Sequence, residues 1–518
     1  MNRVLLKAEF HWQIRLRPAQ LKERRTNKMS TERFKKFTIL HSNDMHGDFL
    51  AEAQGAEGKL IGGLALLSGY LNQIREEEKN VLYLIAGDMV QGSMIDSEYK
   101  GISTMELMNY LNPDVVTLGN HELDYGLPHL LFLEKVANFP IVNANLYLKK
   151  YHKRLMRPYV ILNVDGFDIL FIGIITESVL SALKMDSDIG SFIGLEDAAA
   201  EAGRICNAYK DDDIDLTVLL THIGFESDKE LAGMLDPEWG VDMIIGGHSH
   251  TILEQPAKVN NILIAQAGTG TDQIGRFDIV VDDDTNSITE WKWQLIPITD
   301  DLAEPDAGLQ EFIDSFKAVI DRKYGTLICR FRKKLTHPTR VEETELGNLF
   351  ADITADHTGT DVVFIGSGSV RANELGPVVT LGDLYRIFPY DDSLSRFTVT
   401  GAHLKQIFAN IMRQENRRGE GECYQINRGI RAVYDNARGE LESLDFHDAP
   451  VSDDGHYTIA LQGFHAENSE KNMGITGDEL KALAGSKILS TSVRDIIEED
   501  MRSHKDFDSQ VEGRLVYK

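Results

Sequence analysis

The amino-acid sequence predicts an α/β protein with two domains and a helix between them. Three observations support this fold class. The chain has 518 residues, which is more than a single hydrophobic core usually organises. From about residue 37 to about residue 298, short β-branched runs alternate with helical stretches, as in βαβ units with a parallel or mixed sheet. After a helical stretch at 308–324, composition and rhythm start anew.

The same pattern gives the boundaries of the parts. The sequence predicts an N-terminal extension at 1–36, a first α/β domain at 37–305, a linker helix within 306–334 and a C-terminal α/β domain at 335–518. Helices are expected at 60–77, 104–111, 195–209 and 344–357. Thr380 and Asp383 are expected to form a capping box at a helix start. Residues 1–28 are expected to be disordered or untranslated, with Met29 as an alternative start.

Five apolar runs of the first domain each end in side chains that bind divalent metals. The runs with their polar endings span 37–46, 81–88, 115–121, 216–222 and 243–250. Short β-branched runs bounded by glycine and polar residues are typical of buried parallel strands. Ligands just beyond such strands share one crevice at the carboxyl edge of the sheet. The sequence therefore predicts one metal site with hydrolytic chemistry.

The number and type of the ligands favour two metals. The candidate ligands are Asp44, His46, Asp88, Asn120, His222, His248 and His250. Seven oxygen and nitrogen donors exceed one tetrahedral zinc site, so we expect two cations that share the carboxylate of Asp88. Two adjacent cations can bind the attacking and leaving oxygens of a displacement and can activate water. Mn²⁺, Zn²⁺, Fe and Co all accept such donors.

Two neighbouring residues are candidates for catalysis. His121 adjoins Asn120 in the chain and cannot easily face the same metal, so we expect it to stabilise the transition state or protonate the leaving oxygen. Asp124 lies three residues further on and would hold the imidazole in one tautomer.

Each motif alone also has a simpler interpretation. An Asp-x-His pair is often a surface or capping pair, a Gly-Asp after a strand is often a turn, and an Asn-His-Glu is often a capped loop. The occurrence of all five motifs at strand ends of one domain favours the metal site.

Charge and cysteine content restrict the function further. The net charge of −27 argues against nucleic-acid partners and suits phosphate chemistry only when metals are bound. Cys206, Cys329 and Cys423 are far apart in the sequence and predict no disulfide framework. Because the sequence contains neither a membrane-length apolar run nor a secretory h-region, we expect a cytoplasmic protein without membrane partners, with an extracellular one as the alternative.

The motifs resemble a known family. Ser-Asn-Asp-Met-His-Gly at 42–47, Gly-Asp at 87–88, Gly-Asn-His-Glu at 119–122, Thr-His at 221–222 and Gly-Gly-His-Ser-His at 246–250 resemble the signature blocks of calcineurin-like metallophosphoesterases. More narrowly, they are similar to the 5′-nucleotidase, UDP-sugar hydrolase and 2′,3′-cyclic phosphodiesterase family. The resemblance implies a four-layer α/β/β/α sandwich followed by a separate C-terminal α/β domain for substrate specificity.

The resemblance also divides the ligands between the metals and points to substrate contacts. It implies one metal at Asp44, His46, Asp88 and His250, and the other at Asp88, Asn120, His222 and His248. In the second domain, Gly-Ser-Gly-Ser-Val-Arg at 366–371 resembles a substrate-binding block with Gly366 in place of Asn, so Arg371 would contact phosphate. A surface ion pair is the alternative for Arg371.

The family stacks the nucleobase between two aromatic rings, and here the sequence departs from its pattern. Cys423 or Tyr424 falls near the first ring position. Phe464 or His465 falls near the second, although core packing is an equal alternative for Phe464.

The predicted function is a dinuclear metal-dependent phosphohydrolase that acts on nucleoside monophosphates or related nucleotides. A 2′,3′-cyclic phosphodiesterase or a sugar-nucleotide or dinucleotide pyrophosphatase is the alternative among enzymes. A catalytically silent nucleotide-binding protein is the alternative from another class, and the complete ligand set argues against it. The sequence leaves the oligomeric state open.

Overall fold

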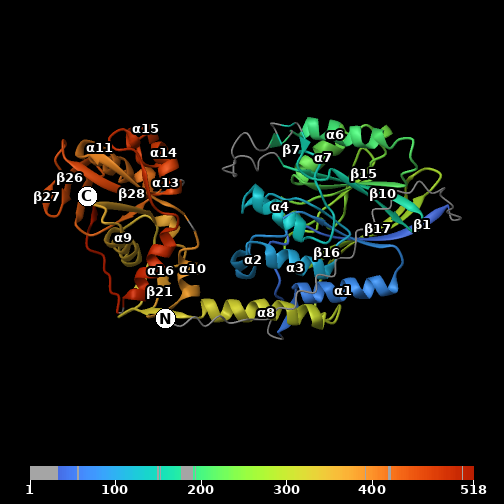
Figure 1. The fold of residues 1–518 in the computed structure, drawn as a ribbon, viewed down its shortest axis with the longest axis horizontal. Coiled ribbons are helices and arrows are strands. Elements are labelled where there is room, and N and C mark those ends of the chain that lie inside the picture. The colour runs from blue at the N-terminus through green and yellow to red at the C-terminus, as the bar shows by residue number, and fades with distance from the viewer. Residues whose placement is uncertain are drawn as a thin grey trace. The chain divides into compact units, whose positions relative to one another are not determined.

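In the computed structural model, the chain forms two compact units (Figure 1). The first unit ends at Asp314 and the second runs from Ser315 to Lys518. The described residues are 33–54, 58–148, 151, 153–176, 191–192, 194–390, 392–417, 422–504 and 506–518. The predictions for residues 1–28 lie outside them.

Two six-stranded sheets form the centre of the first unit. The first sheet has the order β17 (Ser287–Pro297), β16 (Gln273–Asp282), β1 (Phe34–Ser42), β4 (Val81–Ala86), β5 (Val115–Thr117) and β6 (Ile141–Val142). The second has the order β14 (Ala257–Val259), β15 (Ile262–Ala265), β13 (Met243–Ile245), β12 (Leu216–His222), β10 (Phe167–Ile175) and β9 (Tyr159–Val164). In the first sheet β1, β4, β5 and β6 run parallel, and in the second β10, β12, β13 and β15 do.

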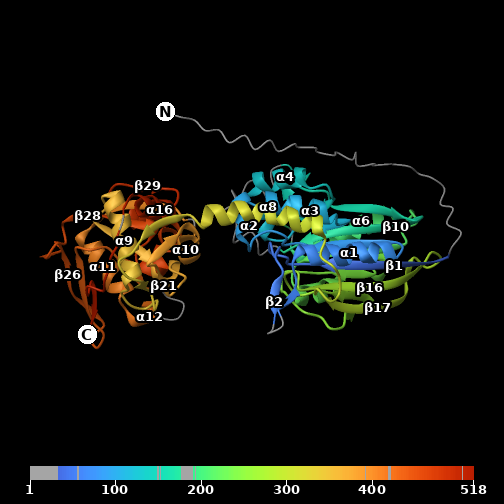
Figure 2. The same cartoon turned by 90° about the horizontal axis from the view of Figure 1, so that it is seen from below.

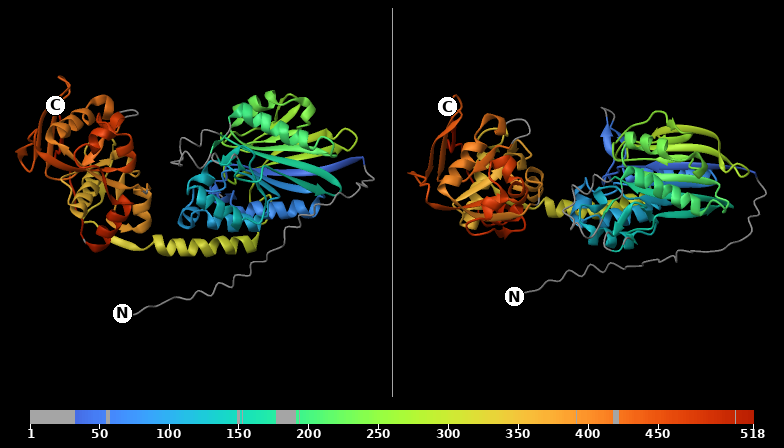
Figure 3. Two further views of the ribbon diagram at one scale, coloured as in Figure 1. Left: turned by 45° about the horizontal axis from the view of Figure 1, so that its top comes forward. Right: turned by 90° about the horizontal axis from the view of Figure 1, so that it is seen from above.

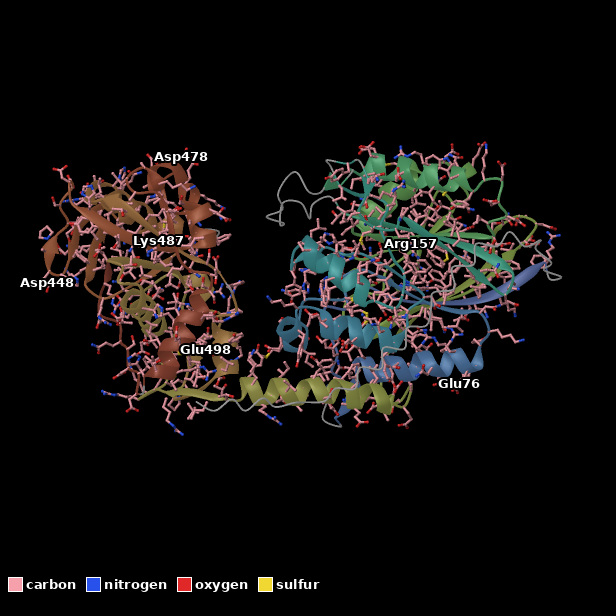
Figure 4. The ribbon with its side chains drawn as sticks, in the orientation of Figure 1. Glu76, Arg157, Asp448, Asp478, Lys487 and Glu498 are labelled. Carbon is pink, nitrogen blue, oxygen red and sulfur yellow. The ribbon has the colours of Figure 1, made fainter. Side chains whose placement is uncertain are left out.

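A hydrophobic core fills the space between the two sheets. It combines Phe37 and Leu84 of the first sheet with Phe171 and Val218 of the second, all fully or almost fully buried. Figure 4 shows side chains crowded between these layers. These strands are continuous apolar runs because both of their faces are covered.

Helices cover the outer faces of both sheets (Figures 1 and 2). On the side of the first sheet lie α1 (Leu64–Glu77), α2 (Met94–Tyr99), α3 (Ile102–Leu111) and α4 (Leu127–Val136). On the side of the second lie α6 (Leu195–Ala208) and α7 (Phe225–Met234), which pack on a core of their own. The predicted four-layer α/β/β/α sandwich is confirmed. Helix α1 begins at Leu64 rather than at residue 60, because Gly62 and Gly63 adopt φ of 69° and 82°, outside the helical region.

Shorter elements complete the first unit. They are β2 (Glu52–Gln54), β3 (Lys59–Ile61), β7 (Leu146–Leu148), β8 (Lys153–Arg154), β11 (Ser191–Phe192), η1 (His121–Leu123) and η3 (Pro237–Trp239). The boundary between the units falls within α8 (Ala307–Tyr324), which matches the expected helix at 308–324.

The second unit contains a five-stranded and a four-stranded sheet. Figure 3 shows this unit, coloured mainly orange to red, in two further views. The first has the order β24 (Tyr424–Ile426), β20 (Val362–Gly366), β28 (His456–Gln462), β23 (Leu394–Thr400) and β29 (Lys487–Ser490). The second has the order β27 (Ala449–Pro450), β26 (Glu440–Phe446), β25 (Ile430–Asp435) and β30 (Leu515–Tyr517). Two-stranded ribbons pair β18 (Leu327–Arg330) with β22 (Val378–Thr380) and β19 (Leu335–Thr336) with β21 (Glu374–Leu375).

Several helices flank these sheets. They are α9 (Glu345–Thr358), η4 (Ser367–Ser369), α10 (Leu381–Ile387), α11 (Gly401–Ile411), α12 (Gln414–Arg417), α13 (Gly463–Glu467), α14 (Ser469–Met473), α15 (Gly477–Lys481) and α16 (Val493–Ser503). The capping box of Thr380 and Asp383 is present at the start of α10, as predicted. None of the helices in the described part of the chain has both the length and the apolar character that crossing a bilayer requires.

Candidate functional site

All seven candidate ligands of the first unit lie at or just beyond the carboxyl ends of parallel strands. The loops after β1, β4 and β5 come from the first sheet, and the end of β12 and the loop after β13 come from the second. His222 Nδ1 donates a hydrogen bond of 2.8 Å to the backbone oxygen of Ala86, which ties the end of β12 to the end of β4. The carboxyl edges of both sheets therefore meet at one place.

The backbone is strained at five of the seven candidate ligand positions. Positive φ angles occur at Asp44 (51°), His46 (49°), Asp88 (52°), His248 (82°) and His250 (51°). A non-glycine residue in this region costs on the order of 1–3 kcal/mol, and such strain persists where the surrounding structure enforces it, often at functional sites. The three loops that contain these five residues thus direct their side chains at a cost in local backbone energy.

One group of donors consists of Asp44, His46 and His250. The Nε2 atoms of the two histidines lie 3.0 Å apart. Asp44 Oδ1 lies 3.3 Å from His250 Nε2 and 3.9 Å from His46 Nε2. His46 Nδ1 donates to the backbone oxygen of Gln91 at 3.2 Å, so its Nε2 lone pair faces the other donors.

A second group consists of Asp88, Asn120, His222 and His248. His222 Nε2 lies 3.0 Å from Asp88 Oδ2. The amide oxygen of Asn120 lies 2.8 Å from His248 Nδ1 and 3.2 Å from His222 Nε2. Tertiary structure therefore brings together four donors from three loops and the end of one strand.

Asp88 belongs to both neighbourhoods, because its Oδ2 also lies 4.0 Å from His46 Nε2. The candidate triads Asp44–His46–His250 and Asp88–His222–His248 each have ligand atoms within 4.8 Å of one another. The donors are carboxylate, amide and imidazole groups without sulfur. Such a set fits a pair of divalent cations of the Mn, Fe, Co or Zn type.

The electrostatics of the pair Asp88 and His222 support this fit. Burial lowers the pKa of His222, but the adjacent carboxylates of Asp88 and Asp44 outweigh burial and raise it to about 9. Carboxylates that favour the protonated form of His222 would also favour a metal cation at this point.

His121 and Asp124 form the hydrogen-bonded pair that the sequence predicts. His121 Nδ1 lies 2.7 Å from the Asp124 carboxylate, and both side chains are one-third exposed. This hydrogen bond raises the pKa of His121 above its ordinary value, although burial opposes it. The backbone N–H of His121 donates to Asp88 Oδ1 at 2.9 Å, so the pair is fixed beside the candidate ligands.

Glu122 is a site residue that the sequence analysis missed. It is almost fully buried, and its carboxylate accepts backbone N–H groups of Asp88, Met89 and Gly119 at 3.0, 2.7 and 2.6 Å. It therefore joins the loop after β4 to the loop after β5. The absence of a side chain at Gly119 lets the loop after β5 approach Asp88, because a Cβ on Gly119 would lie 2.1 Å from Asp88 Oδ1. The only signal in the sequence was its place in the Gly-Asn-His-Glu motif.

Asn43 supports the neighbouring ligand Asp44. Its side-chain amide donates to Asp44 Oδ2 and to the backbone oxygen of Gly268, each at 2.7 Å. Asp44 is fully buried, and this donor, together with the backbone N–H of His248 at 2.9 Å, holds its carboxylate. This contact joins segments that are distant in the sequence.

In the second unit, Arg371 and Phe464 follow the carboxyl ends of β20 and β28, which pair in parallel. The Arg371 guanidinium lies 5.0 Å from the centroid of the Tyr390 ring, and its Nε donates to the Tyr390 hydroxyl at 2.8 Å. Phe464 is 57% and Tyr390 44% exposed. The backbone N–H of Phe464 donates to the Asp392 carboxylate at 2.9 Å, which joins the end of β28 to the segment that contains Tyr390 and Asp392.

The sequence predicted that Tyr424 contacts the substrate, but in the structure its side chain lies in the core of this unit. Its side chain is 1% exposed and packs edge-on against Phe364. Its hydroxyl lies 3.0 Å from Nδ1 of His465, which is itself buried. A Cβ at Gly366 would lie 2.1 Å from His465 Nε2, so the imidazole occupies the space beside this glycine. A ring covered in this way cannot stack on a nucleobase.

A two-sheet sandwich with these donors at its strand ends defines the class of calcineurin-like metallophosphoesterases, and comparisons with known proteins agree. Residues 37–251 match the family described as calcineurin-like phosphoesterase. Residues 326–476 match the family described as 5′-nucleotidase, C-terminal domain. The chain therefore belongs to the 5′-nucleotidase family of calcineurin-like metallophosphoesterases, whose catalytic domains use divalent metals.

Individual relatives are similar over most of the chain. The endonuclease YhcR of Bacillus subtilis (strain 168) is 27% identical over 458 residues, which cover 83% of this chain and 37% of YhcR. A snake venom 5′-nucleotidase of Crotalus adamanteus is 26% identical over 537 residues, which cover 93% of this chain and 88% of the venom protein. A crystal structure of a 5′-nucleotidase precursor from Thermus thermophilus shares the fold, with a TM-score of 0.60, 23% identity and coverage of 93% and 99%.

The matching regions do not always span the relatives. The alignments cover only 37% and 31% of the lengths of YhcR and of the trifunctional nucleotide phosphoesterase YfkN of Bacillus subtilis (strain 168).

Proposed function

We propose that the protein is a dinuclear metal-dependent phosphohydrolase that releases phosphate from nucleoside monophosphates or related nucleotides. The observation that carries this proposal is the convergence of seven oxygen and nitrogen donors beside the His121–Asp124 pair. The net charge of −27 would repel a phosphate ester, and bound dications would reverse the local sign.

The donors divide between two metals in this proposal. Asp44, His46, Asp88 and His250 would hold one, and Asp88, Asn120, His222 and His248 the other. Bound divalent cations supply Lewis-acid polarisation of the phosphoryl group and a water of lowered pKa. Mn, Zn, Fe and Co are the candidates, and elemental analysis of active protein distinguishes them.

His121 would act on the leaving oxygen. The Asp124 carboxylate accepts a hydrogen bond from Nδ1–H of His121, so Nε2 is the nitrogen that can donate a hydrogen bond or a proton to the leaving oxygen. The raised pKa of His121 suits this role, because a larger fraction of the imidazole is protonated near neutral pH.

The second unit would recognise the substrate. Arg371 offers a planar guanidinium for phosphate, and Phe464 offers an exposed ring on which a nucleobase can stack. The exposed ring of Tyr390 lies beside Arg371. Its hydroxyl accepts a hydrogen bond from Arg371, so a bound phosphate would either replace this hydroxyl or share the guanidinium with it.

A panel of substrates tests the reaction. We expect metal-dependent release of phosphate from nucleoside 5′-monophosphates and loss of turnover in His121→Ala. Cleavage of 2′,3′-cyclic nucleotides or sugar nucleotides without monoesterase activity would replace the proposal by a diesterase or a pyrophosphatase. Nucleotide binding with turnover that His121→Ala does not alter would favour the catalytically silent alternative.

Two further predictions concern partners and location. We infer a small-molecule substrate rather than a nucleic acid from the acidic charge, and because one relative is named an endonuclease, single-stranded RNA and DNA belong in the panel. We also infer a cytoplasmic location, with an extracellular one as the alternative, and cell fractionation distinguishes them.

A further inference from the structure

Asp96 on α2 is a fully buried carboxylate of the first unit that the proposed catalytic machinery does not use. Its Oδ2 accepts the backbone N–H of Gln91 at 2.8 Å and the hydroxyl of Tyr125 at 3.3 Å. Its Oδ1 accepts the hydroxyl of Thr104 on α3. Donors from three separate segments therefore converge on one side chain.

The first of these contacts leads to a metal ligand. Gln91 has a φ of 71°, and the N–H bond to Asp96 helps to hold its peptide in this conformation. The backbone oxygen of the same residue accepts from His46 Nδ1 at 3.2 Å. Because that bond fixes the tautomer and the ring plane, it directs Nε2 of His46 toward Asp44 and His250.

Two further contacts lead to neighbouring parts of the site. Tyr125 directly follows Asp124, the partner of His121. Gly47 directly follows His46, and a Cβ on Gly47 would lie 3.2 Å from the Asp96 Cβ. Asp96 thus forms hydrogen bonds with the loop after β4 and with the residue that follows the His121–Asp124 pair, and it lies close to the residue that follows His46.

We propose that Asp96 is a positioning residue that sets the orientation of His46 through Gln91 and couples it to the His121–Asp124 segment through Tyr125. The proposal rests on the proposed metal-dependent function. A carboxylate suits this position, because it offers acceptor sites on both oxygens to three donors and brings no donor of its own.

Two substitutions of Asp96 test this role. Asp96→Leu removes all of the acceptor atoms. Asp96→Asn keeps one oxygen that can accept from Gln91 and Tyr125, and its amide can donate to the Thr104 hydroxyl. Asp114→Leu is the matched control. Asp114 is a half-buried carboxylate that also accepts a backbone N–H, that of Tyr83 at 2.8 Å, but it lies at the amino end of β5, away from the site.

Mn²⁺ affinity by titration calorimetry and steady-state turnover of AMP are the two readouts. We expect Asp96→Leu to weaken Mn²⁺ binding roughly 10- to 100-fold and to lower kcat at saturating Mn²⁺, as changes to groups that orient ligands do. Asp96→Asn should restore most of both. Asp114→Leu should lower thermal stability and leave Mn²⁺ affinity unchanged.

Equal Mn²⁺ affinity and kcat in Asp96→Leu and Asp114→Leu would overturn the inference and assign Asp96 a structural role only. If Asp96→Leu fails to fold, Tyr125→Phe tests the coupling instead. We expect a several-fold lower kcat in this variant. An unchanged kcat and an unchanged Mn²⁺ affinity would overturn the coupling. A wild-type protein that binds no Mn²⁺ or other divalent metal would instead reject the proposed function itself.

Discussion

Replacement of Glu122 by glutamine should lower both stability and turnover, although Glu122 contacts neither metal nor substrate in our proposal. Its Oε2 accepts the N–H groups of Asp88 at 3.0 Å and Gly119 at 2.6 Å, and its Oε1 accepts that of Met89 at 2.7 Å. Glutamine has the same shape but only one acceptor oxygen. In its best orientation the amide oxygen keeps two bonds, and the NH₂ group faces the N–H of Met89.

The magnitude follows from these contacts. A buried N–H without an acceptor costs about 1–3 kcal/mol, and loss of the charge weakens the two remaining bonds, so we expect about 2–4 kcal/mol in total. For a unit of this size that corresponds to a fall in Tm of about 4–8 °C. Because the loops that carry Asp88 and Asn120 lose their common anchor, kcat should fall about 10- to 100-fold.

Thermal unfolding and steady-state phosphate release at saturating metal measure the two effects. Asp242→Asn is the matched control, since Asp242 is a carboxylate that accepts the N–H of Thr217 at 2.9 Å just before β13, at the amino end of the strand. The control should lose stability and keep its kcat. A Glu122→Gln protein with lowered Tm and wild-type kcat would refute the argument that this carboxylate positions the ligand loops.

Four further predictions concern catalysis, metals, pH and substrate. His121→Ala should lower kcat about 10²- to 10⁴-fold with little change in KM, and Asp124→Asn should lower it less, both measured by phosphate release. Dialysis against EDTA should abolish activity and Mn²⁺ should restore it; full activity in metal-free protein would reject the dinuclear mechanism. Burial lowers the pKa of His465 from 6.5 to about 4, so the unfolded chain takes up its proton first. The native state should therefore lose up to about 3 kcal/mol as pH falls from about 6.5 to about 4, and urea titrations of His465→Gln should lack this loss. Phe464→Ala should raise KM for AMP about 5- to 100-fold with kcat little changed, and an unchanged KM would exclude stacking on this ring.

The sequence alone determined the class of fold and selected the candidate donors. Open α/β sheets place their sites just beyond the carboxyl ends of buried strands, and each strand with its ending is a continuous stretch of chain. Asp88 and His222 could therefore be selected from local pattern. The capping box at Thr380 and the helix after Pro305 were predictable for the same reason, since their determinants are only a few residues apart.

Tertiary structure decided which side chains are accessible and what holds the ligands in place. Tyr424 and Phe464 are both aromatic residues near strand ends, but only packing distinguishes the buried ring from the exposed one. Glu122 and Asp96 are ordinary acidic residues in the sequence. Their roles depend on N–H and hydroxyl donors from other segments, which local patterns do not encode because long-range hydrogen-bond partners exist only in the folded chain.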